Sequence, residues 1–402
     1  MSLAATIETM RSKHLPARRE RLFDVARDIH SHPEIRFEER HAAARLVAEL
    51  RESGFDTIAG YAGLATAFVG RWRTPGATED APRIAIFCEY DALEGIGHGC
   101  GHNIIAASGL GAAQMVKDVL AGAEDVPAHL MVVGSPAEEG AAGKVPLIEA
   151  GLLEGVDVAM MTHPAGFNEA HFESMARVAL DVTFHGRASH AAGSPEDGIN
   201  ALDASTLSLT AIGLLRQQIK DGARIHAIVT DGGQAPNIIP ERSALRVFVR
   251  SGDPVYLREE LVPRVQRCFE GAAIATGCQV EQVQNTPAYL TMETPAVLAD
   301  LTLEGFAALG REAASGPGFS GSTDMGNVSH VVPAMHPMLE LVPGIANHTV
   351  EFAAAAVGDA AERAIEDGAL LLAASALELI RRPELREQAQ RDFEARLSQS
   401  QE

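Results

Sequence analysis

The sequence predicts an α/β protein with a mostly parallel sheet, interrupted by an inserted α+β domain. Two observations carry this prediction. Short apolar runs alternate with helical patterns near the start of the chain, and the texture changes to alternating apolar and polar residues near residue 174. The first pattern resumes late in the chain. We therefore expect a discontinuous domain of residues 1–174 and 288–402, and an inserted domain of residues 175–287.

The first domain is expected to begin with helices and continue with alternating strands and helices. Apolar residues recur at helical spacing in 17–30 and 38–53, and Gly54 closes the second helix. Apolar runs bounded by Gly, Pro or Asp predict strands, with a helix over 104–120; these runs are 83–90, 128–136 and 156–164. Such alternation favours a largely parallel sheet.

The inserted segment has the β-α-β-β-α-β order of a ferredoxin-like domain. Residues 176–186 alternate apolar and polar side chains, as a half-exposed antiparallel strand does. The elements that follow are a helix, two strands, a helix and a strand, predicted over 200–219, 224–233, 243–251, 256–277 and 278–286.

After the insert the α/β pattern returns. A helix is predicted over 296–310 and a strand over 336–342. A long Ala-rich helix over 352–380 and a charged tail complete the chain.

Composition limits the classes of partner. The chain has 402 residues, of which 46% are hydrophobic, and a net charge of −21. Its field repels nucleic acid and anionic membrane surfaces, so we expect neither as a partner. Four cysteines do not make a disulfide framework in a chain of this length. Neither a signal peptide nor a transmembrane run is visible, and we expect a cytoplasmic protein.

Polar side chains cluster directly after predicted strands, where functional groups gather in open α/β sheets. They offer a thiolate, imidazoles and carboxylates, which together suit Zn²⁺ or Mn²⁺. The residues are Asp91, Cys100, His102, Glu138, Glu139, His163 and His348.

Cys100 has three interpretations. Alone it is typical of a buried thiol. A nucleophilic thiol would need a base, which His98 or His102 could supply. The metal interpretation is favoured, because a nucleophile leaves the Glu pair and the two later histidines unexplained. In a strand-like turn, Cys100 and His102 can also point to one side and share a metal.

The Glu138–Glu139 pair indicates two different roles for the two carboxylates. Neighbours on an extended segment point apart, so one carboxylate can bind metal while the other faces the metal-bound water. A metal lowers the pKa of that water towards about 7. The second carboxylate can then take the proton as general base and pass it to a leaving amine.

The motifs together resemble the di-metal aminoacylase/carboxypeptidase family of metallopeptidases. The similarity is greatest to its amidohydrolase branch, which includes aminobenzoyl-glutamate hydrolase, auxin-conjugate hydrolases and small dipeptidases. It covers residues 20–380 and rests on motifs in family order: "EYDAL…GHGCGHN", "SPAEEG", "THP", "HGRASHAAGSPEDGINALDA", "GGQAPNIIPERS", "STDMGNVS" and "NHT".

The resemblance implies a role for each clustered residue. Cys100 would bridge two metals, with one or two Zn²⁺ or Mn²⁺ ions per chain. His102 and Glu139 would ligate one metal side, and His163 and His348 would complete the pair. Glu138 would be the general base. Asp91 would orient a ligand imidazole.

For the insert, the resemblance implies a lid that closes over a small-molecule substrate and forms a homodimer. His190 would donate to the oxyanion of the tetrahedral intermediate. Asn237 would bind substrate. Weaker substrate-binding candidates are Arg250, Asp324 and His330.

One residue departs from the branch. Glu94 stands where the branch usually has Pro after Asp-Ala-Leu, which removes a fixed φ and adds a negative charge. The ligands are untouched, so the departure concerns the substrate.

The predicted activity is metal-dependent hydrolysis of the amide bond in a small N-acyl or N-aroyl amino acid or dipeptide. Two alternatives stay open. The same metal-bound hydroxide could displace ammonia from an aromatic amine, as a hydrolytic deaminase does. A metal-free binding protein on a hydrolase scaffold is the other, and the complete ligand set argues against it.

Overall fold

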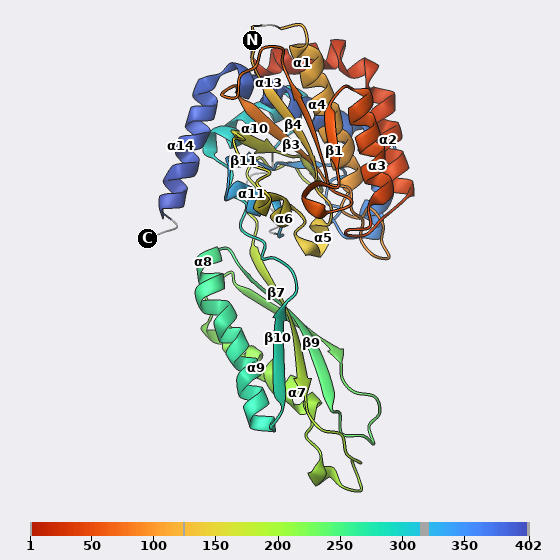
Figure 1. Cartoon of the computed structure of the whole chain (residues 1–402), viewed down its shortest axis with the longest axis vertical. Helices are drawn as coiled ribbons and strands as arrows, with labels where there is room; N and C mark the ends of the chain where they lie inside the picture. Colours follow the sequence, from red (N-terminus) through yellow and green to blue (C-terminus); the bar gives the residue numbers. More distant parts are fainter. Residues whose placement is uncertain (1, 124, 314–320, 400–402) are drawn as a thin grey trace. The chain divides into compact units, whose positions relative to one another are not determined.

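The computed structural model describes residues 2–123, 125–313 and 321–399. The chain forms two compact units (Figure 1). The first contains Met1–Glu173 and Met292–Glu402, and the second contains Ser174–Thr291.

A six-stranded sheet forms the centre of the first unit. In spatial order its strands are β1 (Asp56–Ala59), β2 (Phe68–Arg73), β4 (His129–Gly134), β3 (Arg83–Cys88), β5 (Val158–Met160) and β11 (Ala334–Met335). β2 runs antiparallel to both of its neighbours, and every other pair is parallel. The mostly parallel sheet is therefore confirmed, although β1 and β2 were not predicted. β1 is an edge strand with little buried surface, so it lacks the apolar run that marks the central strands.

Both faces of this sheet are buried. On β3, Ile84 and Ile86 pack into one apolar cluster, whereas Ala85 and Phe87 pack into another. Burial on both faces explains why this strand is a continuous apolar run.

Helices supply the partners for the two clusters. The first cluster includes residues of α1 (Leu3–Lys13), α2 (Arg19–Ser31), α3 (Arg40–Glu52), α4 (His102–Leu120), α10 (Ala296–Leu309), α13 (Asp359–Arg381) and α14 (Pro383–Gln399). α4 and α13 pack against each other. The second cluster includes residues of α6 (Lys144–Glu149) and α11 (Met325–Ser329).

Two predicted elements are broken. The strand expected over 156–164 ends at Met160, and the chain resumes as β6 (His163–Ala165) in a separate two-stranded sheet with β12 (Met338–Glu340). The long helix expected over 352–380 is two helices, α12 (Val350–Ala355) and α13. Gly358 lies between them with φ 90°, which a continuing helix does not allow.

The second unit has one four-stranded antiparallel sheet in the order β10-β7-β9-β8. Along the chain its main elements are β7 (Ala176–His185), α7 (Ala201–Leu215), β8 (Arg224–Asp231), β9 (Arg242–Ser251), α9 (Val262–Thr276) and β10 (Gln279–Gln284). This is the predicted β-α-β-β-α-β order. Alternate residues of β7 and β9 enter one apolar cluster with α7 and α9, as the alternating sequence pattern requires.

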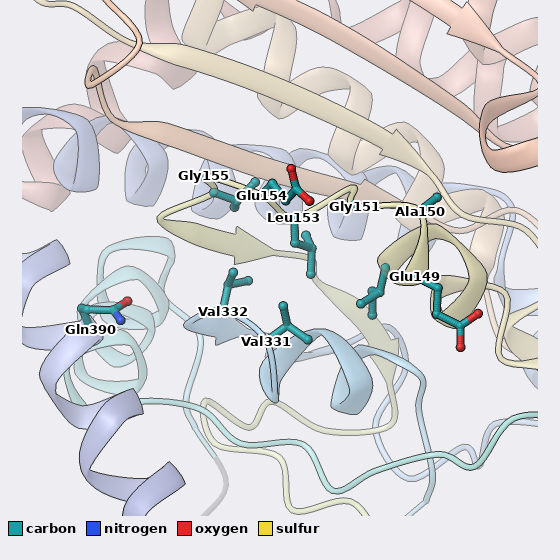
Figure 2. Close-up of a pocket in the computed structure, with 11 residues that line it drawn as sticks. Glu149, Ala150, Gly151, Leu153, Glu154, Gly155, Val331, Val332 and Gln390 are labelled. Carbon is teal, nitrogen blue, oxygen red and sulfur yellow. The ribbon is translucent and has the colours of Figure 1, made fainter.

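The amino ends and the carboxyl ends of the parallel strands have different surroundings. A cavity of about 610 Å³ lies at the amino ends of β5 and β11, lined in part by Leu153, Glu154 and Val332 (Figure 2). No predicted site residue is among its described lining residues. The predicted chemistry instead follows the carboxyl ends of β3, β4 and β5.

Two further findings concern membrane-spanning helices and disulfides in the described part of the chain. No helix there is long and apolar enough to cross a bilayer. All four cysteines are free thiols, with Cys88 and Cys100 buried.

Candidate metal centre and active site

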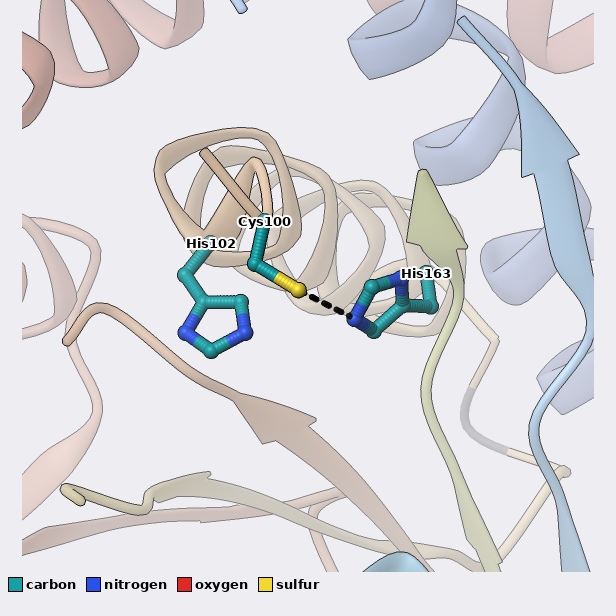
Figure 3. Close-up of side chains that lie close together, drawn as sticks. All are labelled: Cys100, His102 and His163. Carbon is teal, nitrogen blue, oxygen red and sulfur yellow. Dashed lines mark hydrogen bonds between the residues drawn. The ribbon is translucent and has the colours of Figure 1, made fainter. Parts of the chain in front are cut away.

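The first group of donors lies where β3, α4 and β6 meet. Cys100 Sγ lies 3.5 Å from His163 Nε2, and the rings of His102 and His163 are 5.8 Å apart (Figure 3). Gly101 makes the turn between Cys100 and α4 with φ 74°, and a Cβ there would lie 2.6 Å from Pro164. Only glycine satisfies both conditions at low cost, so the turn presents the thiol and the first imidazole of α4 together.

A second group shares the same thiol. Cys100 Sγ lies 3.5 Å from His348 Nε2, which lies 3.2 Å from Glu139 Oε1. His348 has φ 65°, a conformation uncommon for a residue with a side chain. The donor atoms of Cys100, His102 and His163 lie within 4.8 Å of one another, as do those of Cys100, Glu139 and His348. The donor atoms of His102, Glu138 and Glu139 also lie within 4.8 Å of one another, so Cys100, His102 and Glu139 each belong to two of these groups.

Asp91 connects the donors. His102 Nδ1 donates to Asp91 Oδ1 at 3.0 Å, and the backbone N–H of Glu139 donates to Asp91 Oδ2 at 2.8 Å. In the neutral imidazole this hydrogen bond keeps the proton on Nδ1, so Nε2 is the nitrogen that can bind a metal.

The residues fit a divalent metal. His102 Nε2 and Glu89 Oε2 are buried and have no hydrogen-bond partner within the described residues, whereas Glu139 Oε1 is paired with the His348 imidazole at 3.2 Å. Buried polar atoms are rarely left unpaired, so the first two atoms point to a bound cation. A thiolate, imidazoles and carboxylates suit Zn²⁺, and the last two also suit Mn²⁺.

The charges prepare the Cys100 thiol and Glu139 in their binding forms, whereas the His348 imidazole must lose a proton before it can bind a metal. Burial and Glu139 oppose ionisation of the Cys100 thiol, but His163 and His102 outweigh them and lower its pKa to about 6. Burial would raise the pKa of Glu139, yet the hydrogen bond from His348 and the charge of His102 lower it to about 2. Hydrogen bonds to Cys100 and Glu139 raise the pKa of His348 to about 11. Metal ligation requires the deprotonated thiol and carboxylate.

Glu138 lies beside these ligands on an irregular turn labelled α5 (Glu138–Ala141). Its carboxylate lies within 4.8 Å of ligand atoms of His102 and Glu139. Burial, Glu89 and Glu139 raise its pKa well above the ordinary value. A carboxyl group in such surroundings has the proton affinity that a general base or acid needs.

A buried ion-pair network below the site was not predicted. Lys144 has no exposed surface, and its Nζ contacts Glu89 Oε1 and lies 2.5 Å from Asp324 Oδ1. These two carboxylates raise the pKa of Lys144 despite its burial. Glu89 Oε2 lies 3.5 Å from His102 Nε2, so the network reaches the ligands. A carboxylate at the end of the apolar run 83–90 was the available signal.

The position of Asp324 differs from the one expected of a substrate-binding residue. It was expected to bind substrate, but it has no exposed surface and its carboxylate is occupied by Lys144. His330, the other candidate from that segment, is half-buried at the C-terminal cap of α11.

His190 and Asn237 lie side by side in the second unit. The N–H of Ala191 donates to the carbonyl of Asn237 at 3.0 Å, and both side chains are exposed. His190 Nδ1 accepts from the N–H groups of Ala192 and Gly193 at 3.2 and 3.0 Å. Nδ1 therefore carries no proton, and Nε2–H is the donor of this imidazole.

Arg250 lies on β9, opposite Arg177 on β7. The Arg177 guanidinium stacks over Tyr289 at 4.0 Å and over Phe248 at 4.7 Å. Arg250 is half-buried, and burial beside Arg177 lowers its pKa. It is thus part of an arginine–aromatic cluster. Glu94, by contrast, is exposed on its loop.

One further donor cluster is on the surface of the first unit. Asp28, His32 and His41 offer ligand atoms within 4.8 Å of one another. Arg45 Nη1 lies 3.2 Å from Asp28 Oδ2 and already neutralises that carboxylate, so we assign this cluster no metal.

The α/β fold thus carries a set of donors that suits divalent metals, and the family match identifies the chain as a hydrolytic enzyme. A family profile described as peptidase family M20/M25/M40 matches residues 79–378, so the chain belongs to that family. The resemblance drawn from the motifs is confirmed.

Individual relatives agree with this assignment. The chain is 37% identical to Xaa-Arg dipeptidase of Mus musculus over 415 residues, covering 100% of this chain and 96% of the relative. It is 38% identical to Xaa-Arg dipeptidase of Homo sapiens over 399 residues, covering 95% and 91%. A Bacillus subtilis crystal structure, described as a dinuclear metal binding peptidase from the M20 family, matches with a TM-score of 0.67 and 22% identity. It covers 91% of this chain and 99% of that chain, and supports the fold.

Proposed function

We propose that this enzyme hydrolyses the amide bond of a small N-acyl amino acid or dipeptide at the Cys100 centre. The observation that carries the proposal is one thiol shared by two donor groups, with the buried carboxyl of Glu138 beside both. Membership of a peptidase family and similarity to a dipeptidase both support amide cleavage.

Two divalent ions, Zn²⁺ or Mn²⁺, would be held by the shared thiolate. His102 and His163 would hold one ion, and Glu139 and His348 the other. When bound, such ions polarise a carbonyl oxygen and make water more acidic. Asp91 keeps His102 in the ligating tautomer through the hydrogen bond to Nδ1.

Glu138 would act in both halves of the reaction. Its carboxylate takes a proton from the attacking water, whose oxygen forms the new bond to the carbonyl carbon. The carboxyl group then returns the proton to the amide nitrogen as the C–N bond breaks, which releases an amine and a carboxylic acid that gives its remaining proton to solvent. His190 would donate its Nε2–H to the carbonyl oxygen as negative charge develops there.

The substrate we favour is a dipeptide with a basic C-terminal residue. Two relatives that cover 100% and 95% of this chain are named Xaa-Arg dipeptidases. The net charge of −21 would attract a cationic substrate over long range. The second unit would contribute His190 and Asn237 to substrate binding and would form the contact of a homodimer.

A hydrolysis screen tests the proposal. Protein loaded with Zn²⁺ or Mn²⁺ is assayed against Xaa-Arg dipeptides, matched Xaa-Glu dipeptides, acylated amino acids and aromatic amines. We expect free arginine from the first set at the highest kcat/KM. Ammonia released from the aromatic amines without amide cleavage would replace the proposal with hydrolytic deamination.

A further inference from the structure

The turn that carries Glu138 and Glu139 has a backbone conformation that its own residues do not favour. Ala137 has φ 60° and ψ 38°, and Ala142 has φ 53° and ψ 53°. Left-handed conformations of residues with a Cβ persist only where the surroundings impose them. The direction of the Glu138 side chain, which follows Ala137 directly, is therefore set by groups outside the turn.

Buried carboxylates from distant segments bind the backbone N–H groups of this turn. Ala137 N donates to Glu39 Oε1 at 2.9 Å, Glu139 N donates to Asp91 Oδ2 at 2.8 Å, and Lys144 N donates to Asp324 Oδ2 at 3.0 Å. The carboxylates of Glu39, Asp91 and Asp324 are at most 1% exposed. Hydrogen bonds to carboxylates are among the stronger ones in proteins.

Glu39 acts at the residue next to the proposed general base. The same Oε1 also accepts from Phe37 N at 2.8 Å, and Phe37 is itself left-handed with φ 63°. One oxygen thus joins two left-handed residues from segments about 100 positions apart in the chain. Glu39 has no exposed surface, and its Oε2 has no hydrogen-bond partner among the described residues.

Burial and the charge of Asp91 raise the pKa of Glu39 to about 7, so this group can stay in the interior without a cation beside it. Among the described residues Glu39 forms no ion pair, whereas Asp324 is paired with Lys144. The Oε1 contact with Ala137 is the feature that links Glu39 to the active-site turn.

We propose that Glu39 is a positioning residue for Glu138, holding Ala137 in its left-handed conformation and thereby aiming the carboxyl of Glu138. The inference rests on the proposed role of Glu138 as general base. The described hydrogen bonds of Glu39 Oε1 are with backbone N–H groups, so Glu39 acts through the backbone of the turn.

Two substitutions separate positioning from charge. Glu39→Gln removes the charge but keeps a carbonyl oxygen at the position of Oε1. Glu39→Asp keeps the charge but is one methylene too short to reach Ala137. Positioning predicts that the Gln variant keeps kcat within about threefold of the parent, and that the Asp variant loses about 10²-fold, the scale that a misplaced reacting group costs. KM and bound metal should change little in either.

Controls keep the outcomes distinct. Glu38→Gln alters an exposed neighbour and should leave kcat unchanged. Glu138→Gln is assayed in parallel. If it keeps full turnover, the proposed function fails; if it is inactive while Glu39→Asp is fully active, only the positioning inference fails. A Gln variant as impaired as the Asp variant, with metal retained, would also overturn the inference, because charge would then be what matters.

Discussion

The proposed catalytic groups are held very differently in the two units. In the first unit, Cys100, His102 and Glu138 are buried and surrounded by charged partners. In the second, His190 and Asn237 are exposed, and the described hydrogen bonds of His190 Nδ1 come from its own loop. Groups that bind a metal must be fixed before it arrives, whereas groups that bind substrate can be presented on a surface loop.

Metal removal should have the largest effect and should be confined to the first unit. Chelation leaves the buried atoms His102 Nε2 and Glu89 Oε2 without a partner, so we expect activity to disappear and the melting temperature to fall. Hydrogen exchange should increase around α4 and β6 and stay unchanged in β7–β10. Activity that survives complete metal removal, checked by elemental analysis, would contradict the assignment of the centre.

Glu138→Ala should be the most damaging substitution that spares metal binding. Loss of a general base lowers kcat by about 10²–10⁴-fold. Bound metal should stay at the parental stoichiometry, because Glu138 is not among the proposed ligands. Single-turnover kinetics separate the chemical step from product release, and a kcat near that of the parent would exclude this role.

His190→Ala should cost about 10²–10³-fold in kcat, the range for removing one oxyanion donor. We expect bound metal and the free energy of unfolding to be unaffected, because His190 is exposed on a loop of the second unit. His185→Ala, an exposed histidine of the same unit, is the matched control. A loss of metal in His190→Ala would mean that the contrast between the units is wrong.

Lys144→Met tests the buried network by stability. Removing the ammonium leaves Glu89 and Asp324 as buried uncompensated charges, which costs about 3–5 kcal/mol of unfolding free energy. Lys220→Met is the counterpart in the second unit. Its pair with Asp253 is exposed, at 3.2 Å, and should contribute only about 0–1 kcal/mol. Urea denaturation of both variants gives the comparison directly; equal losses would contradict it.

Glu94→Gln should have the smallest effect. The side chain is exposed on its loop, and a single screened surface charge contributes about 0–1 kcal/mol. We expect kcat/KM for an Xaa-Arg dipeptide to change less than about fivefold. A larger loss, absent for a neutral dipeptide, would instead give Glu94 a direct contact with the basic side chain.

The sequence alone determined the alternation of strands and helices in the first unit and most of the donor set. This was possible because residues after parallel strands meet at one edge, so Cys100, His102 and His163 could be expected together before their distances were known. The family could also be predicted, because each of its motifs is a continuous stretch of the sequence.

The tertiary structure decided what long-range contacts control. Glu39 and Lys144 have no local pattern that marks them, because their partners come from segments far away in the chain. Asp324 looked like a substrate contact until its burial against Lys144 was seen. Which donors pair around Cys100, and which carboxylates hold the 137–144 turn, depends on packing between segments, and a one-dimensional pattern does not contain that information.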